Sequence, residues 1–417
     1  MNRTDAGVNL LGLRSHNTAL VLDLLRTAGP DGISRLELAE RTGLTPQAVS
    51  KITARLRLEG LAAEAGRRAS TGGKPRTVLR LVPEAGHAVG VHLDRDELRV
   101  VLAQLDGRTV RERCVPLSLG AGAETVLEAV TREVANLLGD TPPAPAVSSA
   151  PDIPPAPAVS SAPGIPPAPA VSSAPDIPPA PVVSSAPAVS PAPDTPPALL
   201  GVGVALPGPL DHARGVLHRV TGFPEWDGFP LRDALAERLG TPVVVDKDTN
   251  AAALGLAVGG ERGSFACLHL GTGLGAGLVI GGTLHRGART GAGEFGHQVI
   301  QLDGPPCPCG NRGCVEALCL AALGRGDVGE AARVLGEGAA NLAGLLDIDA
   351  VLLGGRAIAA APEPFLHGVT AVLQARARRE GSPQDAVRVR LAPHGARAVA
   401  HGAAQLCLAP LFGRETG

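Results

Sequence analysis

PVVVDKDTNAAALG, residues 242–255, begins with a proline and three consecutive valines and continues with three charged residues. A short β-branched run bounded in this way predicts a strand that ends in a polar turn. Strands with polar or glycine-rich ends are also predicted in residues 199–211 and 265–287, and a β-hairpin in residues 88–107. Because these strands alternate with helix-like stretches beyond residue 83, the sequence predicts a protein of the α/β class.

The composition of the chain favours a globular protein with a large core. Its 417 residues are enough for two or three domains, and 44% of them are hydrophobic. Only 2% are aromatic, so leucine, valine and alanine must fill the core. No apolar run reaches the ~18 residues that would span a membrane, and the first residues lack the apolar segment of a signal peptide. We therefore expect a cytoplasmic protein with reduced thiols, in which clustered cysteines indicate a metal site rather than disulfides.

Charge is unevenly distributed along the chain. The formal net charge is −2, but residues 1–82 contain 13 Arg and Lys against 7 Asp and Glu. The remaining residues therefore carry a net negative charge. A basic N-terminal part on an acidic body indicates that the N-terminal part meets a polyanion.

A proline-rich repeat interrupts the chain in residues 141–198. Its twelve-residue unit begins as PPAPAVSSAPDI at residue 142, and the segment holds 20 of the 38 prolines with no aromatic or basic residue. Proline removes backbone donors, so an expanded, partly polyproline-II segment is expected. A stacked solenoid and a ligand for an SH3-like domain are the less favoured alternatives. Without this segment a predicted helix in residues 126–140 would join a predicted strand in 199–211, which indicates an insertion inside a domain.

A helix-turn-helix is predicted in residues 33–60. Ser34 and Glu37 form a capping box at the start of the first helix, and Gly43 allows a tight turn after it. Three residues are expected to give this helix its apolar side, namely Leu36, Leu38 and Ala39. A helix upstream, in residues 17–28, is expected to pack against the pair.

The second helix, residues 45–59, is predicted to be the recognition helix. Thr45 is a favoured N-cap and Pro46 suits the first helical position. The apolar residues of this helix recur at helical spacing and are expected to face inward. The residues expected to contact DNA from this helix are Thr45, Gln47, Ser50, Lys51 and Arg55.

Two short strands in residues 61–81 are predicted to form a wing. The tip between them is rich in glycine and arginine, and Arg67, Lys74 and Arg76 are expected to contact DNA there. The alternative is an ordinary small helical domain with a solvated basic face. The caps, the turn and the charged tip together favour DNA binding.

Five motifs beyond residue 200 resemble one known family. In chain order they are LPGPLD (206–211), DKDTNAAALG (246–255), GTGLGAGLVIGG (271–282), GAGEFGH (291–297) and CPCGNRGCVE (307–316). Together they resemble the ROK family of sugar kinases and sugar-responsive repressors, over nearly all of residues 85–412 apart from the insert. The resemblance implies a two-lobed, actin-like sugar-kinase fold of the ribonuclease H-like type, with sugar held in the cleft.

With the winged helix-turn-helix in front, the chain resembles the repressor branch of the family, of the xylose- or glucose-responsive type. The expected organisation is a DNA-binding domain, rich in α-helix, in residues 1–82 and a sugar-binding domain in residues 83–417. The lobes of that domain are expected to be 83–250, with a C-terminal return near 400–417, and 251–399. The insert 141–198 falls inside the first lobe.

The resemblance places Zn²⁺ on His297, Cys307, Cys309 and Cys314. Three thiolates and one imidazole form a closed tetrahedral set, which is typical of a structural site. The alternative is a chance cluster of reduced cysteines. The other four cysteines are expected to serve packing, namely Cys114, Cys267, Cys319 and Cys407.

By the same resemblance, Glu294, His297 and Glu316 contact the sugar, His297 while one of its nitrogens binds the metal. Asp248 occupies the position of the catalytic base of the family's kinases, and in a repressor it would only hold the sugar. Lys247 departs from the family pattern, which has asparagine there, and lysine cannot accept a hydrogen bond. Asn250 is expected to have a local structural role.

A kinase of this family needs two phosphate loops, and only the second is present. Its residues are Gly271, Thr272, Gly273 and Gly275. The first loop should read Asp-x-Gly-Gly-Thr, but residues 92–96 read HLDRD, with two acidic side chains where phosphate would lie. We expect that ATP is not turned over.

The sequence therefore predicts a sugar-responsive transcriptional repressor without enzyme activity. Its expected partners are operator DNA, a monosaccharide effector and a second copy of the chain, because paired half-sites require a two-fold arrangement. An ATP-dependent hexose kinase with an appended DNA-binding domain is the alternative. A scaffold that recruits a partner through the proline-rich insert is a third reading.

Overall fold

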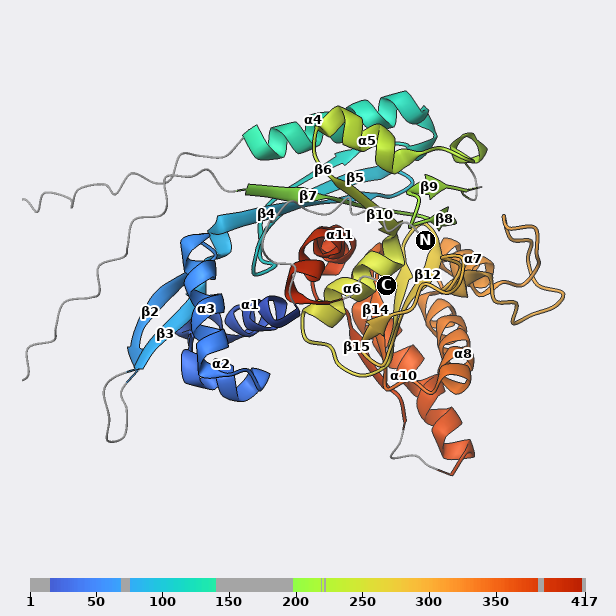
Figure 1. The fold of residues 1–417 in the computed structure, drawn as a ribbon. Coiled ribbons are helices and arrows are strands. Elements are labelled where there is room, and N and C mark those ends of the chain that lie inside the picture. The colour runs from blue at the N-terminus through green and yellow to red at the C-terminus, as the bar shows by residue number, and fades with distance from the viewer. Residues whose placement is uncertain are drawn as a thin grey trace, which may run out of the picture. The chain divides into compact units, whose positions relative to one another are not determined.

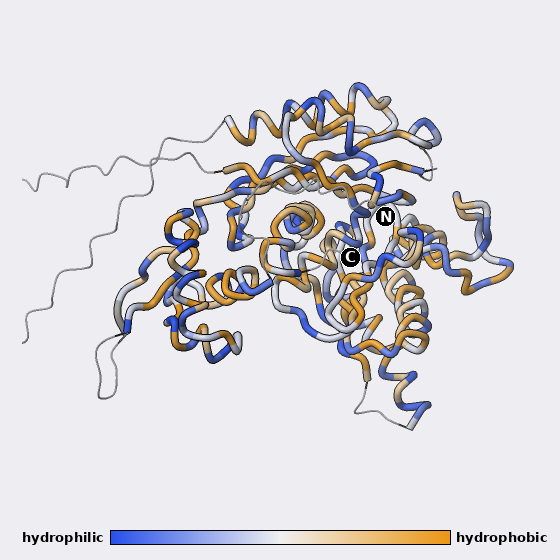
Figure 2. Tube along the Cα trace, viewed as in Figure 1, coloured by the Kyte–Doolittle hydropathy of each residue, from blue (hydrophilic) through white to orange (hydrophobic). Residues whose placement is uncertain are grey.

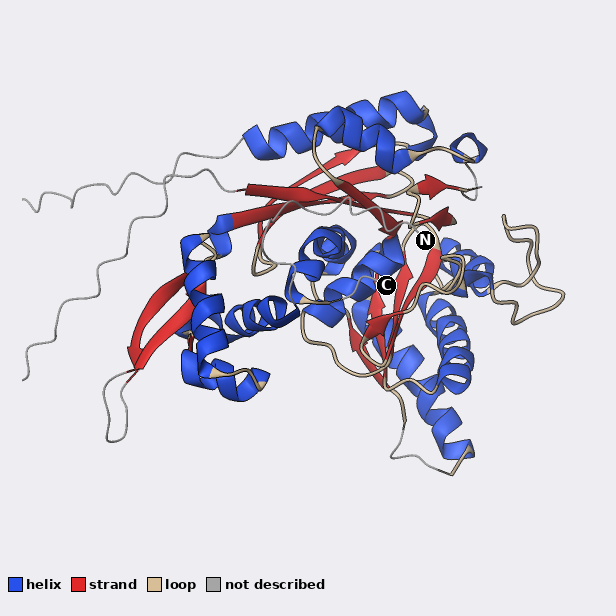
Figure 3. Ribbon diagram, viewed as in Figure 1, coloured by secondary structure: helices blue, strands red, loops and turns tan. Residues whose placement is uncertain are grey.

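The computed structural model describes residues 16–68, 76–139, 198–218, 220, 223–381 and 386–414. The fold is mixed α/β, with two five-stranded sheets and helices packed on both, so the predicted fold class is confirmed (Figure 1, Figure 3). The predicted insert lies outside the described residues except for Ala198, which begins β7. No helix among the described ranges is long and apolar enough to cross a membrane.

Three helices and a small sheet form the N-terminal region. Its elements are α1 (His16–Ala28), β1 (Ile33–Ser34), α2 (Arg35–Thr42), α3 (Pro46–Leu58), β2 (Ala62–Arg68) and β3 (Arg76–Leu81). The sheet has the order β1-β3-β2 and is antiparallel, which makes β2 and β3 a hairpin behind the helix pair. The Ser34 capping box is present in both directions, and Gly43 ends α2 in the left-handed conformation. This arrangement is that of a winged helix-turn-helix.

The first large sheet has the strand order β10-β7-β4-β5-β6. Its strands are β4 (Gly86–Leu93), β5 (Glu97–Gln104), β6 (Thr109–Pro116), β7 (Ala198–Leu206) and β10 (Val243–Lys247). β10, β7 and β4 run parallel, and β4, β5 and β6 are antiparallel to one another in turn. The central strands β4 and β7 are buried almost throughout, as expected for strands covered on both faces. Helices α4 (Ala123–Gly139) and α5 (Leu231–Leu239) pack against it and close one hydrophobic core.

The second large sheet has the strand order β13-β12-β11-β14-β15. Its strands are β11 (Phe265–Leu270), β12 (Leu274–Ile280), β13 (Thr283–Leu284), β14 (Ala350–Gly354) and β15 (Arg388–Leu391). Four helices share a core with this sheet, namely α7 (Val315–Gly324), α8 (Val328–Leu346), α9 (Arg356–Ala360) and α10 (Pro362–Arg379). Their apolar residues form a second core with β11, β12 and β14. Apolar residues predominate along the central strands of both sheets (Figure 2). A further small hairpin is made by β8 (Leu210–Asp211) and β9 (Val216–Leu217).

Two alanine-rich helices, α6 (Asp248–Val258) and α11 (Ala398–Leu408), pack against each other. α11 also contacts β4 and β7 of the first sheet, while α6 contacts β11 and β12 of the second (Figure 1). Every residue of α6 except Asp248 is buried. Gly402 is required at the crossing, because a Cβ there would overlap the carbonyl oxygen of Ala251. Small residues thus bring the two helices close, in keeping with the low aromatic content.

Two expectations about packing are wrong. Leu36 was expected to face inward but is 42% exposed, because α2 has only eight residues and turns Leu38 and Ala39 toward the core instead. Cys114 was expected to be buried but is exposed, because β6 is an edge strand whose side chains alternate in burial. The other three single cysteines, at 267, 319 and 407, are buried as predicted.

Candidate functional site

A polar cleft opens where several strands end. It lies beyond the carboxyl ends of β7, β10 and β11, and encloses about 620 Å³ including its open mouth. The cleft brings together all the predicted sugar contacts and the glycine-rich turn, namely Asp248, Glu294, His297, Glu316, Gly271, Thr272, Gly273 and Gly275.

Asp248 is the first residue of α6 and faces this cleft. Its Oδ1 accepts a hydrogen bond from the backbone N–H of Thr249 at 2.6 Å. Burial raises the pKa of Asp248, against the opposing effects of His269, of that hydrogen bond and of Lys247. A carboxyl held in this way can accept hydrogen bonds from a ligand hydroxyl.

The structure explains the departure at Lys247. Its buried ammonium donates to Glu294 Oε1 at 2.9 Å and to the carbonyl oxygen of Ala292 at 2.5 Å. Lys247 therefore neutralises and orients Glu294, whose side chain is 43% exposed and lines the cleft. An asparagine at position 247 would offer the ligand an acceptor, whereas this lysine offers only donors.

A buried network beneath the cleft fixes this part of the chain. Asp246 Oδ2 accepts two hydrogen bonds from Arg286, at 2.8 and 2.6 Å, and both side chains are almost fully buried. Asp246 Oδ1 accepts from the Lys247 backbone N–H at 2.8 Å and from Asn250 Nδ2 at 2.9 Å. The predicted local structural role of Asn250 is thus observed. Arg286 was missed by the sequence, since it lies 40 residues from its partner and in no recognisable motif.

Glu316 connects the helix α7 to the glycine-rich turn. It lies in the first turn of α7, is 5% exposed, and accepts a hydrogen bond from the backbone N–H of Leu274 at 2.7 Å. A Cβ at Gly273 would lie 3.1 Å from Glu316 Oε2, so the close approach favours glycine there. The carboxylate is therefore fixed at the wall of the cleft by the turn itself.

The turn after β4 is held across the cleft by ion pairs. Arg356, at the start of α9, donates to both oxygens of Asp96 at 2.8 and 2.9 Å and lies 3.8 Å from Asp94. The hydroxyl of Thr272 donates to Asp94 Oδ1 at 2.9 Å. Sequence analysis missed Arg356, although it directly follows the glycine pair at the end of DIDAVLLGG. The two carboxylates of this turn are thus already bound, Asp96 to the Arg356 guanidinium and Asp94 to the Thr272 hydroxyl.

Two histidines lie behind the turn. The rings of His92 and His269 meet edge to face, with centroids 6.3 Å apart. Burial lowers the pKa of His92 to about 3, so its ring is neutral at physiological pH. The Nδ1 atoms of both rings are buried and have no hydrogen-bond partner among the described residues. His269 lines the cleft, and sequence reasoning did not single it out.

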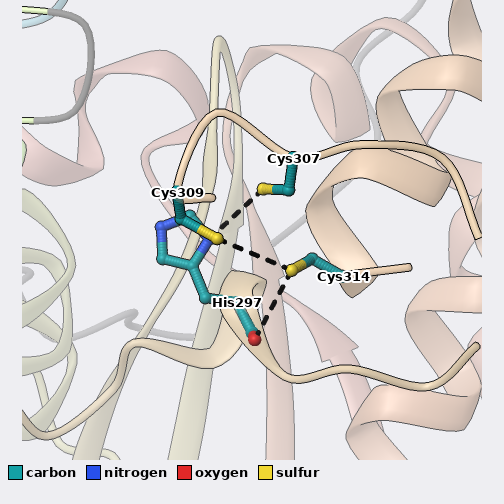
Figure 4. Close-up of side chains that lie close together, drawn as sticks. All are labelled: His297, Cys307, Cys309 and Cys314. Carbon is teal, nitrogen blue, oxygen red and sulfur yellow. Dashed lines mark hydrogen bonds between the residues drawn. The ribbon is translucent and has the colours of Figure 1, made fainter. Parts of the chain in front are cut away.

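His297, Cys307, Cys309 and Cys314 form one compact cluster (Figure 4). One ligand atom from each lies within 4.8 Å of the others. The His297 Nδ1–Cys307 Sγ and Cys309 Sγ–Cys314 Sγ distances are both 3.7 Å. Burial raises the pKa of the Cys314 thiol to about 12, and the neighbouring thiols act in the same direction. This His/Cys group could hold a metal ion, which would replace the protons of the thiols.

On the N-terminal region, the predicted DNA-contacting residues are mostly exposed. The side chains of Thr45, Gln47, Ser50 and Lys51 face solvent along α3, as does that of Arg76 at the start of β3. Arg55 instead turns toward α1, where its Nη2 donates to Thr18 Oγ1 at 2.7 Å. The side chain of Arg67, and Lys74, lie outside the described residues.

Comparison with known proteins relates part of this chain to one family. The model of the ROK family matches residues 174–323. A xylose repressor of Caldicellulosiruptor bescii is 28% identical over 287 residues, which are 68% of this chain and 59% of that protein. A glucokinase of Thermotoga maritima is 42% identical over 124 residues, 29% of this chain and 39% of that protein. Residues 174–323 thus match the ROK family, and the relatives include both a repressor and a kinase.

Among solved structures, a ROK family transcriptional regulator described as a homologue of the E. coli MLC protein has a TM-score of 0.65. The two are 20% identical, and the similarity covers 95% of this chain and 96% of that one. It therefore includes the fold of the N-terminal region. The match to the C. bescii xylose repressor spans about six tenths of that protein's length.

Proposed function

We propose that this protein is a sugar-responsive DNA-binding transcriptional regulator that acts in the cytoplasm as a repressor of carbohydrate genes. The observation that carries the proposal is the combination of a winged helix-turn-helix with a carboxylate-lined cleft in one chain. Residues 1–82 would bind operator DNA and residues 83–417 a monosaccharide. A homodimer would place two recognition helices on paired half-sites.

The cleft supports a sugar as effector. Asp248, Glu294 and Glu316 present acceptors that are held in place by the protein. The Lys247 ammonium has one N–H left beyond those given to Glu294 and Ala292. Each sugar hydroxyl can donate and accept one or more hydrogen bonds, and a ligand without those hydroxyls would leave the carboxylates unpaired. His297 lies on the wall between the cleft and the His/Cys cluster.

Zn²⁺ is the metal that this donor set favours. With Zn–S bonds of ~2.3 Å, the edge of a tetrahedron is about 3.8 Å long, which is close to the spacings in the cluster. Four protein ligands leave no open position, so the metal would be structural. It would fix the loop between Glu294 and Glu316, which carries the sugar contacts.

The chemistry at the first phosphate turn supports a protein without kinase activity. The carboxylates of Asp94 and Asp96 are already paired with Thr272 and Arg356. A nucleotide phosphate approaching this turn would meet two negative charges and would have to displace a bidentate ion pair. The glucokinase relative keeps a hexose kinase as the second candidate.

An ATP assay separates these two candidates. The full-length protein with ATP, Mg²⁺ and glucose or xylose is expected to release no more ADP than the same mixture without sugar, because the phosphate turn is occupied. Coupled detection of ADP measures this. Sugar-dependent ADP release that an Asp248→Asn variant abolishes would establish the kinase instead.

The main test is DNA binding with and without sugar. In fluorescence anisotropy at fixed salt, the protein is expected to bind DNA from upstream of its own gene. One sugar among glucose, xylose and N-acetylglucosamine is expected to weaken that binding by at least about fivefold, a typical coupling. Specific DNA binding that no sugar changes would leave the cleft without the proposed role.

Helix α6 offers a physical route from the cleft to α1. It begins at Asp248, and its last carbonyls accept from Arg26 of α1, at 3.5 Å from Val258 O, and from Arg414, at 3.4 Å from Ala257 O. The Arg26 guanidinium also lies 5.1 Å from the ring centroid of Phe412. A shift of α6 on sugar binding would therefore be transmitted to α1 through the hydrogen bond from Arg26.

Arg26→Ala tests this route. The variant is expected to bind sugar with unchanged affinity but to show a smaller sugar effect on DNA binding, since the substitution removes the link to α6 and, besides it, only the contact with Phe412 and the pair with Asp23 on the same helix. Calorimetry measures the first quantity and anisotropy the second. Arg333→Ala, on the distant helix α8, is the control, and an undiminished sugar effect in Arg26→Ala would exclude the route.

A further inference from the structure

A second cavity lies away from the cleft, at the other end of the first sheet. Its lining residues are Gly107, Arg108, Thr109, His394, Arg397 and His401. They come from the turn between β5 and β6 with the first residue of β6, and from α11 with the segment that leads into it. None of the lining residues is acidic, while two are arginines and two are histidines.

The two histidines are held against each other. The rings of His394 and His401 stack with centroids 4.2 Å apart and planes 22° apart. Thr109 Oγ1 lies 3.4 Å from His401 Nδ1, and a Cβ at Gly255 of α6 would lie 3.5 Å from Cδ2 of that ring. Stacked imidazoles next to an arginine are a poor environment for two further positive charges.

The cations around the cavity are incompletely neutralised. Arg397 donates to Glu112 at 3.4 Å, but the same carboxylate is also bonded to Arg99. Arg108 donates to the neutral side chain of Gln104 at 3.0 Å, and Asp106 accepts from the Arg108 backbone rather than from its guanidinium. The described surroundings thus offer one shared carboxylate to several basic groups.

We propose that this cavity is a binding site for a small divalent oxyanion of the phosphate class, distinct from the sugar cleft. Arg397 and Arg108 supply charge-assisted hydrogen bonds, and the imidazoles of His394 and His401 supply further N–H donors. The site adjoins the segment that joins β3 to β4, because the backbone N–H of Leu105 donates to the carbonyl oxygen of Pro83 at 3.1 Å.

Binding is expected to depend on pH. Burial lowers the pKa of His394, and burial together with His394 and Arg397 lowers the pKa of His401 to about 4. The groups that face these rings are Arg108, Arg397 and, through Arg397, Glu112; Thr109 and Gly255 do not titrate. A bound dianion favours the protonated rings, so it binds with uptake of protons and more tightly at lower pH.

Histidine-ring NMR of the full-length protein with sulfate as the probe tests the proposal, because sulfate keeps its charge over this pH range. A saturable shift of the His394 and His401 signals is expected, with an affinity at least about threefold higher near pH 5.5 than near pH 8. His394→Gln assigns the signals. In Arg397→Ala the affinity should fall by about tenfold, whereas Arg333→Ala, an equally exposed arginine paired with a glutamate, should not change it.

The outcomes decide the proposal without reference to sugar or DNA. Signals of both rings that do not move with sulfate, at constant ionic strength, would overturn it. Movement of the same size in Arg397→Ala and in the parent would also overturn it, since the arginine would then contribute nothing. Inorganic phosphate in place of sulfate should give the same pattern of shifted signals.

Discussion

Replacing Asp246 by alanine is expected to destabilise the protein by ~3–5 kcal/mol, the usual result of leaving one partner of a buried ion pair unpaired. Arg286 would lose both of its hydrogen bonds to Asp246 Oδ2, in a place where its side chain is 5% exposed. Asn250 Nδ2 and the backbone N–H of Lys247 would lose their acceptor as well. Chemical denaturation measures the change in the free energy of unfolding.

The matched control is a surface pair with similar geometry. Arg333 and Glu330 are 2.8 Å apart, but the arginine is 57% exposed. Arg333→Ala is therefore expected to cost less than about 1 kcal/mol. If Asp246→Ala costs no more than this control, the buried pair does not stabilise the fold as its geometry indicates.

A double variant separates the charge from the packing. In Asp246→Leu with Arg286→Met, no charge remains buried without a partner, and most of the lost stability is expected to return. The cleft should still be impaired, because the Lys247 backbone N–H and Asn250 Nδ2 lose their acceptor, and both residues flank Asp248. Recovery of stability without recovery of sugar binding would show that the network positions the cleft.

Local signals in the sequence predicted the N-terminal region well. Helix caps involve residues only a few positions apart, so they can be recognised in the sequence alone. The residues concerned are Ser34, Glu37, Gly43, Thr45 and Pro46. The structure has the expected cap at each of these positions. The prediction for Leu36 was wrong because helical periodicity alone does not say which of the leucines at 36 and 38 the rest of the fold covers.

The residues expected to contact sugar were taken from the motifs and do line one cleft, but the electrostatics of the cleft were not predicted. The departure at Lys247 was visible in the sequence, whereas its partner Glu294 is 47 residues away and became evident only from the fold. The pairs of Arg286 with Asp246 and of Arg356 with Asp96 span 40 and 260 residues. Such pairs depend on how strands and helices are brought together, and one sequence carries no local sign of them.

The same limit applies to the second cavity. Arg108 and His401 lie nearly 300 residues apart and in no recognised motif. Their proximity arises because α11 returns to pack on the first sheet. By contrast, the four members of the His/Cys cluster lie within 18 residues, and three of them share one motif. This explains why the sequence predicted the cluster as a unit.

Replacing Cys314 by serine is expected to remove the proposed zinc and to destabilise the second lobe. The parent protein should carry about one zinc ion per chain and the variant far less. With only three protein ligands left, water can reach the fourth position of the metal. Cys314 is fully buried and immediately precedes α7. Metal analysis after gel filtration measures the zinc, and thermal denaturation the stability.

Cys319→Ser is the matched control. Cys319 is also fully buried, lies on the same helix and is not a member of the cluster. This variant should lose some stability through its buried hydroxyl but keep its zinc. Equal zinc in all three proteins would rule out the assignment of the four residues as ligands.

Loss of the metal should also weaken sugar binding in the cleft. Cys314 and Glu316 are two residues apart at the start of α7, and Glu316 holds the turn at Leu274 through a 2.7 Å hydrogen bond. Without the metal this start is free to fray, so sugar affinity should fall in Cys314→Ser but not in Cys319→Ser. Acidification should mimic the variant, because burial raises the pKa of Cys314 to about 12 and protons compete with the metal for its thiolate. Zinc retained equally at low and neutral pH would contradict thiolate ligation.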